Sequence, residues 1–259
     1  MTMMSRWAPR IYGTASVVVA LIVWQLIAAS GRFGQALPTA TASIGAAADL
    51  LIKPTTWIAI GITVLTAVVG LLISAVLGII LGIFLGTSRV FTAATRVVIE
   101  FLKPIPPIVI LPVVVLVLGP KIDMAVFLVV FGCMLPIAVQ TAAGVLETNP
   151  VALDTARSFQ LNRFQILSRV VLPSASPFIA NSVRVNAPAS LIIAVVAGLF
   201  GGAPGLGYLL FRAVQTANSQ QIFALVLIMG FIGLIFQYGS IAIEKKLLPW
   251  QPAFREVAR

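Results

Sequence analysis

The feature that most restricts the fold of this chain is a series of long apolar runs. A transmembrane helix needs about 20 mainly apolar residues to cross the hydrocarbon core of a bilayer, and six stretches of this sequence qualify. Apolar residues make up 60% of the chain and charged residues only 9%, whereas a soluble domain carries about 25% charged residues. The sequence therefore predicts an all-α, polytopic membrane protein with about six transmembrane helices in one domain, residues 1–259. The predicted spans are 11–30, 58–86, 97–119, 124–143, 178–200 and 222–243.

Basic residues are divided unequally between the two sides that six spans create. Because cytoplasmic loops carry the excess of Lys and Arg, both termini are expected in the cytoplasm of a multi-pass protein of the bacterial plasma membrane. The net charge of +10 is scattered between apolar runs, so no clustered basic face for nucleic acid is expected. The cytoplasmic set is Arg6, Arg10, Arg89, Arg96, Arg157, Arg163, Arg169, Lys245, Lys246, Arg255 and Arg259, and the external set is Arg32, Lys53, Lys121 and Arg212.

The residue types that are missing restrict the chemistry. The chain has no His, and its only Cys, Cys133, lies inside an apolar run. These facts exclude a His/Cys metal site and a His-based acid–base mechanism, and no cofactor is expected. The sequence has no phosphate-binding loop of the Walker type, so any ATP hydrolysis would belong to a partner subunit. The first apolar run is longer than the apolar core of a signal peptide, and we expect it to be retained.

The predicted cytoplasmic loop 147–177 carries a second helical pattern. Polar and apolar residues alternate with helical spacing after Asn149-Pro150, which favours two short amphipathic helices with a break near Leu161-Asn162. Pro173 and Pro177 are expected to end the second helix. On spacing alone the loop fits either a helix lying on the inner leaflet or a helix that docks into the groove of a cytosolic partner.

The residues of this loop resemble the EAA loop of binding-protein-dependent ABC importer permeases. That loop typically reads Glu-Ala-Ala, three residues and Gly, and it ends in an aliphatic residue followed by Leu-Pro. Asp154 takes the acidic position and Leu172-Pro173 the closing pair, while Thr155 replaces the first Ala and Gln160 replaces the Gly. The resemblance implies that the loop couples the chain to ATPase subunits through Asp154, Thr155, Ala156, Phe159, Gln160, Leu161, Asn162 and Arg163.

The resemblance extends over most of the chain. The proline-rich segment 101–112, the turn 205–208 and the closing segment 244–248 are similar to the nitrate, sulfonate and taurine branch of these permeases. That branch commonly has Trp and then Glu in its fifth span, where this chain has Leu191 and Gly198. The resemblance implies the type I importer fold. It also implies three kinds of partner: a second permease subunit of the same or a different sequence, two cytosolic ATP-binding subunits, and an extracytoplasmic substrate-binding protein.

Polar residues within the spans are candidates for the translocation path. Arg184 carries a charge at membrane depth, so it is expected to face a cavity, together with Asn181, Asn186 and Ser190 on the same helix. The alternative is that Arg184 snorkels to the inner headgroups.

Two features of the third span concern the same path. Pro106 and Pro107 are expected to break the helix where it lines a cavity. Glu100 and Lys103, three residues apart, are expected to form an ion pair with each other.

Two other classes of function compete with an importer permease. A secondary transporter or channel often shows internal repeats, and the sequence shows no convincing repeat. A membrane-embedded enzyme needs a nucleophile and base or metal ligands, and the spans do not supply them. The substrate is not defined by the sequence.

Overall fold

The computed structural model describes residues 4–249, and within that range it is helical without strands. Arg255 and Arg259, which belong to the predicted cytoplasmic set, lie outside the described residues. The elements in chain order are α1 (Met4–Ala29), η1 (Gly34–Ala36), α2 (Ala40–Ile52), α3 (Pro54–Thr87), α4 (Arg89–Leu102), α5 (Pro107–Leu118), α6 (Ile122–Leu146), α7 (Pro150–Ser158), α8 (Arg163–Ile166), the π-helix η2 (Leu167–Val171), α9 (Leu172–Gly201), α10 (Leu206–Gln215) and α11 (Ser219–Leu247).

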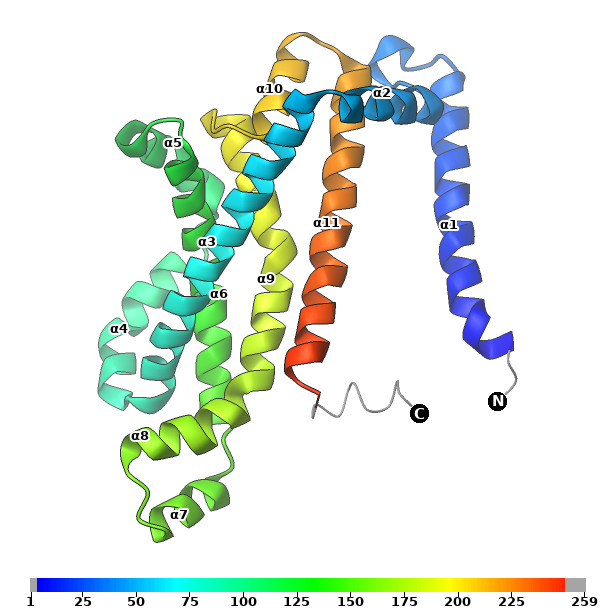
Figure 1. Cartoon of the computed structure of the whole chain (residues 1–259). Helices are drawn as coiled ribbons and strands as arrows, with labels where there is room; N and C mark the ends of the chain where they lie inside the picture. The colour runs from blue at the N-terminus through cyan, green and yellow to red at the C-terminus, as the bar shows by residue number, and fades with distance from the viewer. Residues whose placement is uncertain (1–3, 250–259) are drawn as a thin grey trace.

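The helices form a multi-pass bundle, as the apolar runs predict. Five described helices are long and apolar enough to span a membrane, and a sixth span results if the bent pair α4–α5 is counted as one. Figure 1 shows α3, α6, α9 and α11 running between two ends of the molecule. Helices α2 and α10 lie at one end, and α7 and α8 lie at the other. Helix α2 lies in the segment between the first two predicted spans and ends just before Pro54.

The third predicted span, 97–119, is not one helix. Helices α4 and α5 meet at an angle of 92° across a short break, and α4 begins at Arg89, earlier than predicted. Three of the prolines explain the break, because Pro104, Pro106 and Pro107 have no N–H to donate to the preceding turn. The predicted ion pair between Glu100 and Lys103 is also wrong. Glu100 instead pairs with Arg96, one turn earlier on α4, at 2.9 Å.

The closest contact between spans joins α3 to α6 through small residues. Gly70, Gly78, Gly82 and Gly86 of α3 face α6, and a Cβ added at any of them would lie under 3 Å from an α6 atom. At Gly78, for example, that Cβ would lie 2.7 Å from the carbonyl oxygen of Met134. Small residues at such spacing let two backbones approach within a membrane, where van der Waals contact replaces the hydrophobic effect as the main attraction.

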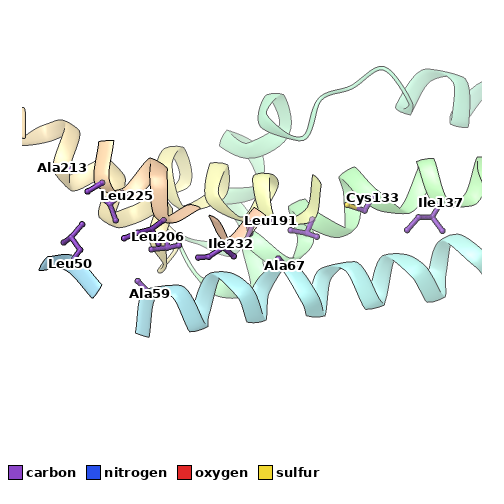
Figure 2. Packing of buried hydrophobic residues seen from close by; sticks show 14 residues of the cluster. Leu50, Ala59, Ala67, Cys133, Ile137, Leu191, Leu206, Ala213, Leu225 and Ile232 are labelled. Atoms are coloured by element: carbon purple, nitrogen blue, oxygen red, sulfur yellow. The ribbon is translucent and has the colours of Figure 1, made fainter. Parts of the chain in front are cut away.

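The largest packed cluster sits where α2, α3, α6, α9, α10 and α11 meet, and Figure 2 shows its buried side chains. It includes Leu50, Ala67, Cys133, Leu191, Leu206 and Ile232. Helix α10 is joined to this cluster by Thr63 of α3, whose hydroxyl accepts a hydrogen bond from the backbone N–H of Leu206 at 2.8 Å. Gly205 permits that approach, because its φ of +136° and the position of Thr63 leave no room for a side chain.

Pro173 and Pro177 do not end the second loop helix. The helical path runs without interruption from Arg163 to Gly201. The π-helical turn Leu167–Val171 comes directly before Pro173, and its wider ring accommodates a proline whose N–H is missing. The fifth span therefore continues into the loop 147–177 as one element and does not begin at residue 178.

Candidate functional site

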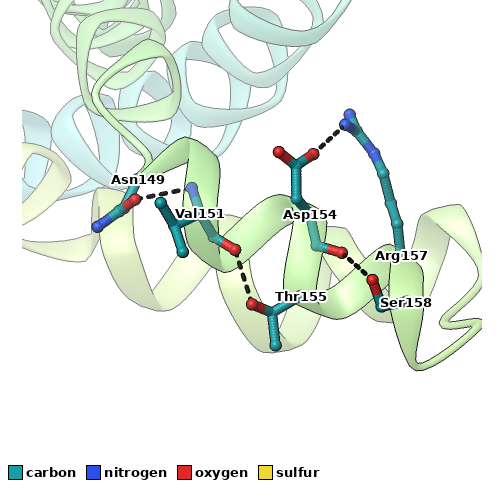
Figure 3. A network of polar contacts seen from close by, with 6 residues as sticks. All are labelled: Asn149, Val151, Asp154, Thr155, Arg157 and Ser158. Carbon is teal, nitrogen blue, oxygen red and sulfur yellow. Dashed lines mark hydrogen bonds and ion pairs between the residues drawn. The ribbon is translucent and has the colours of Figure 1, made fainter.

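Helix α7 begins with a strong local signal and is held by its own polar side chains (Figure 3). The side chain of Asn149 accepts a hydrogen bond from the N–H of Val151 at 2.8 Å, and Pro150 occupies the first turn. Asp154 pairs with Arg157 at 2.9 Å, with both side chains largely exposed. The hydroxyl of Thr155 donates to the carbonyl of Val151 at 2.8 Å. An exposed ion pair such as Asp154–Arg157 contributes about 0–1 kcal/mol to stability. Both charges therefore remain available to a partner.

A sharp bend separates α7 from α8, as the loop pattern predicts. Gln160 adopts φ +56°, the left-handed conformation that usually favours glycine. Its N–H donates to the carbonyl of Arg157 at 2.8 Å. Asn162 then caps α8 in a reciprocal capping box with Gln165. The chain therefore makes the tight turn with Gln where the related loop has Gly, at a conformational cost of about 1–2 kcal/mol.

The two short helices bury one face and expose the other. Ala156 is buried, and Leu153, Ile166 and Leu167 pack against the small cluster of Val145, Val171 and Ala175 at this end of the bundle.

The opposite face is exposed, and it carries two large aromatic side chains beside polar residues such as Asp154 and Arg157. Phe159 is 77% exposed and Phe164 76% exposed. Figure 1 places α7 and α8 beyond the ends of the spans. Large aromatic side chains exposed there indicate a protein contact surface.

A cavity of about 700 Å³ lies between α7 and the adjoining ends of α3, α4 and α6. Three arginines line it: Arg89, Arg96 and Arg157. Arg96 forms an ion pair with Glu100, and Arg157 forms one with Asp154. The α7–α8 loop therefore packs on the bundle through the cluster of Val145, Val171 and Ala175. The cavity between α7 and the ends of α3, α4 and α6 is open and lined by basic residues.

Arg184 has a buried partner that the sequence analysis missed. Its Nε lies 3.0 Å from Oε2 of Glu244 on α11, whose side chain is only 4% exposed. Neither atom has hydrogen-bond geometry, so the contact is an ion pair by distance. Arg184 also donates to the side-chain oxygen of Asn181 at 2.6 Å. The predicted last span stopped at residue 243, but α11 extends to Leu247. The sequence signal that could have identified Glu244 is a single carboxylate at the end of an apolar run.

The other polar residues of α9 face elsewhere. Asn186 and Ser190 are buried and bond within their own helix, to the carbonyls of Ser182 and Ala187. At about 100° per residue they project from the side of α9 roughly opposite to Arg184. The polar stripe expected from Asn181 to Ser190 is therefore split between two faces.

The two positions where the related branch carries Trp and Glu are both packed inside the bundle. Leu191 and Gly198 are buried. A Cβ at Gly198 would lie 3.0 Å from the backbone of Gly207 and Tyr208. The close approach of α9 to α10 therefore leaves no space for a large side chain at that position.

The break between α4 and α5 opens a cavity of about 470 Å³ against α6. Pro106 and Pro107 line it, together with Lys103, Gly132 and Gln140. The α6 residues on its wall fall between Phe131 and Gln140, in the middle of a helix that runs from Ile122 to Leu146. The cavity therefore lies against the central part of α6, and its lining includes the exposed Lys103 and the amide of Gln140.

Comparisons with known proteins agree with this arrangement. Residues 74–247 match the family model described as the binding-protein-dependent transport system inner membrane component. A probable ABC transporter permease of Haemophilus influenzae is 30% identical over 231 residues, which cover 86% of this chain and 91% of that protein. The nitrate import permease of Synechocystis is 25% identical over 253 residues, with 94% and 91% coverage.

Solved structures show the same fold. A chain of the MetNI methionine ABC transporter, in an inward-facing conformation, superposes with a TM-score of 0.67 at 18% identity. The match covers 75% of this chain and 98% of that chain. The helical bundle, the α7–α8 loop at its end and the matched sequence agree. This chain belongs to the family of binding-protein-dependent transport system inner membrane components, and it is a permease subunit of an ABC importer.

Proposed function

We propose that the α7–α8 loop is the surface through which a cytosolic ATPase drives this permease. The observation that supports the proposal is the exposed aromatic pair Phe159 and Phe164 on helices that project past the bundle. An apolar surface of this kind in water is costly unless a partner covers it. Asp154, Thr155 and Arg163 add polar groups at its edge, where they orient a partner without contributing much affinity.

The continuous helix from Arg163 to Gly201 gives this surface a mechanical consequence. A displacement of α8 by the ATPase is carried directly into α9, because no loop separates them. Helix α9 packs against α3, α6, α10 and α11. Movement of the coupling surface therefore changes the packing of the spans that enclose the path.

The same proposal includes the remaining partners. Two ATP-binding subunits would each grip one permease chain, with a second permease subunit completing the path. An extracytoplasmic binding protein would deliver the solute at the end that holds α2 and α10. The ends of α1 and α11 that lie on the α7–α8 side would face the cytoplasm, in agreement with the basic residues Lys245 and Lys246.

The coupling surface is tested by co-purification with the ATPase subunit. Phe159→Ser removes a large exposed side chain that an interface would bury, and Asp154→Lys reverses a charge at its edge. Burial of a Phe is worth about 1.5–3 kcal/mol, so Phe159→Ser should lower the recovered ATPase about tenfold or more. Substrate-stimulated ATP hydrolysis should fall in parallel.

Phe33→Ser is the matched control. Phe33 is 55% exposed but lies at the end of the molecule that holds α2. It should retain full ATPase recruitment. If Phe159→Ser and Asp154→Lys both recruit the ATPase and couple hydrolysis as the unmodified chain does, the loop is not the coupling surface.

A further inference from the structure

The basic cavity between α7 and the spans lies where two apolar helices end. Its volume is about 700 Å³, and its lining includes Leu85 and Leu146. These two leucines are the last large apolar residues of α3 and α6. Because the apolar run of a span matches the hydrocarbon core of the bilayer, the end of the run marks the edge of that core. The cavity is therefore expected at the level of the lipid headgroups.

The charged residues that line this cavity are all arginines: Arg89, Arg96 and Arg157. In the part of the chain that the structure describes, Arg89 forms no ion pair within 4.0 Å. Arg96 uses only its Nε to reach Glu100, and Arg157 uses only one Nη to reach Asp154. Each guanidinium has five N–H donors, so most of them are left for a ligand. Neither carboxylate lines the cavity, which therefore presents positive charge alone.

Helix α4 adds an apolar face beside two of these arginines. Val90, Val97 and Phe101 are exposed, and at about 100° per residue they share one face of α4. Arg89 and Arg96 each stand one residue before a valine of that face, so their side chains leave the helix from the adjoining face. The arrangement places donors for an anionic headgroup next to a surface that suits the acyl chains of the same molecule.

We propose that this cavity binds the phosphate group of an anionic phospholipid. The planar fork of arginine matches phosphate oxygens, and basic pockets between transmembrane helices are suited to such headgroups. A zwitterionic headgroup carries an ammonium of its own, which the three arginines repel. The site goes beyond the proposed coupling to an ATPase and does not depend on it. Because Arg157 belongs to α7 and the other two arginines to α4, the bound phosphate would connect the α7–α8 loop to the spans.

Lipid binding is measured on the purified full-length permease by native mass spectrometry. Phosphatidylglycerol and phosphatidylcholine with identical acyl chains are compared at equal concentrations. The unmodified chain should bind the first phosphatidylglycerol about tenfold more tightly than the first phosphatidylcholine. Arg89→Gln and Arg157→Gln should each weaken the binding of phosphatidylglycerol about fivefold, and neither should change that of phosphatidylcholine.

Two controls separate this cavity from other sources of the same effect. Arg169→Gln removes an exposed arginine at the same end of the bundle that does not line the cavity, and it should leave the preference for phosphatidylglycerol intact. Inorganic phosphate at millimolar concentration should not displace the lipid, because it has no acyl chains to contact the apolar face of α4. Equal melting temperatures for the unmodified chain and the three variants would show that each variant is folded.

Three results would overturn the inference. Equal affinity of the unmodified chain for the two lipids would show that the cavity does not select an anionic headgroup. The same loss of phosphatidylglycerol in Arg169→Gln as in Arg89→Gln and Arg157→Gln would show that the lipid responds to surface charge alone. Displacement of the lipid by inorganic phosphate would assign the arginines to a water-soluble phosphate compound.

Discussion

Arg184 of α9 and Glu244 of α11 lie 60 residues apart in sequence and meet at 3.0 Å. Glu244 is almost fully buried, so its negative charge depends on this arginine for compensation. Removal of one member of a buried pair costs about 3–5 kcal/mol, because it leaves an uncompensated charge. The pair therefore offers a structural reason for Arg184, beside the expectation that it contacts substrate.

The two roles separate in a double substitution. Arg184→Ala alone should lower the melting temperature of the purified permease and abolish transport, since Glu244 is left unpaired. Arg184→Ala combined with Glu244→Ala removes both charges and should recover most of the lost stability.

Transport by the double variant then decides the role. Recovered transport assigns Arg184 to packing between α9 and α11. Restored stability with transport still lost assigns it to the path. Arg184→Lys adds a check, because Lys retains the charge but not the planar fork of Arg.

At the scale of elements, the contact between α3 and α6 depends on residues that have no side chain. Gly78 and Gly82 lie against the carbonyl oxygens of Met134 and Ala138. This packing leaves the break between α4 and α5 facing α6, since α6 is held on its other side by α3. The cavity at the break is therefore positioned by glycines of a different helix.

Gly78→Leu should destabilise the bundle by about 1–3 kcal/mol or more, because the backbones would have to separate. Thermal unfolding in detergent measures the change. Gly61→Leu on the same helix is the control, because nothing lies within 4 Å of a Cβ at Gly61. Equal melting temperatures for the two variants would show that the α3–α6 contact is not tight.

At the scale of the whole molecule, the α7–α8 loop and the α2–α10 region lie at opposite ends of the bundle (Figure 1). The distribution of Arg and Lys predicts that the α7–α8 end is cytoplasmic. The same rule places both chain termini on that side.

Membrane-impermeant labelling of single cysteines in intact cells tests this orientation. With Cys133→Ala as background, Phe33→Cys should be labelled from outside and Phe159→Cys only after the cells are opened. Both native side chains are more than half exposed, so access depends on the side of the membrane. Reporter fusions at Arg259 and in the loop at Ala203 should likewise report opposite sides. Labelling of both cysteines in intact cells would rule out this arrangement of the spans.

The sequence by itself determined the membrane class, the approximate spans and the two short helices of the loop 147–177. Each of these depends on a local property: about twenty apolar residues in a row, a proline after Asn149, or a break in the helical pattern near Leu161-Asn162. The break near Leu161-Asn162 was also predicted, and it lies between α7 and α8, but only the structure showed that Gln160 adopts the left-handed conformation there. Local signals of this kind survive in any fold that the chain adopts.

The tertiary structure decided which side chains meet and which helices continue through a proline. It paired Arg184 with Glu244, and it directed Glu100 to Arg96 and not to Lys103. It also carried the helix through Pro173, because a π-helical turn before it absorbed the missing hydrogen bond. The physical reason is common to all three. In the interior of a membrane protein a charge or a proline is tolerated only through its neighbours, and the neighbours come from distant parts of the chain.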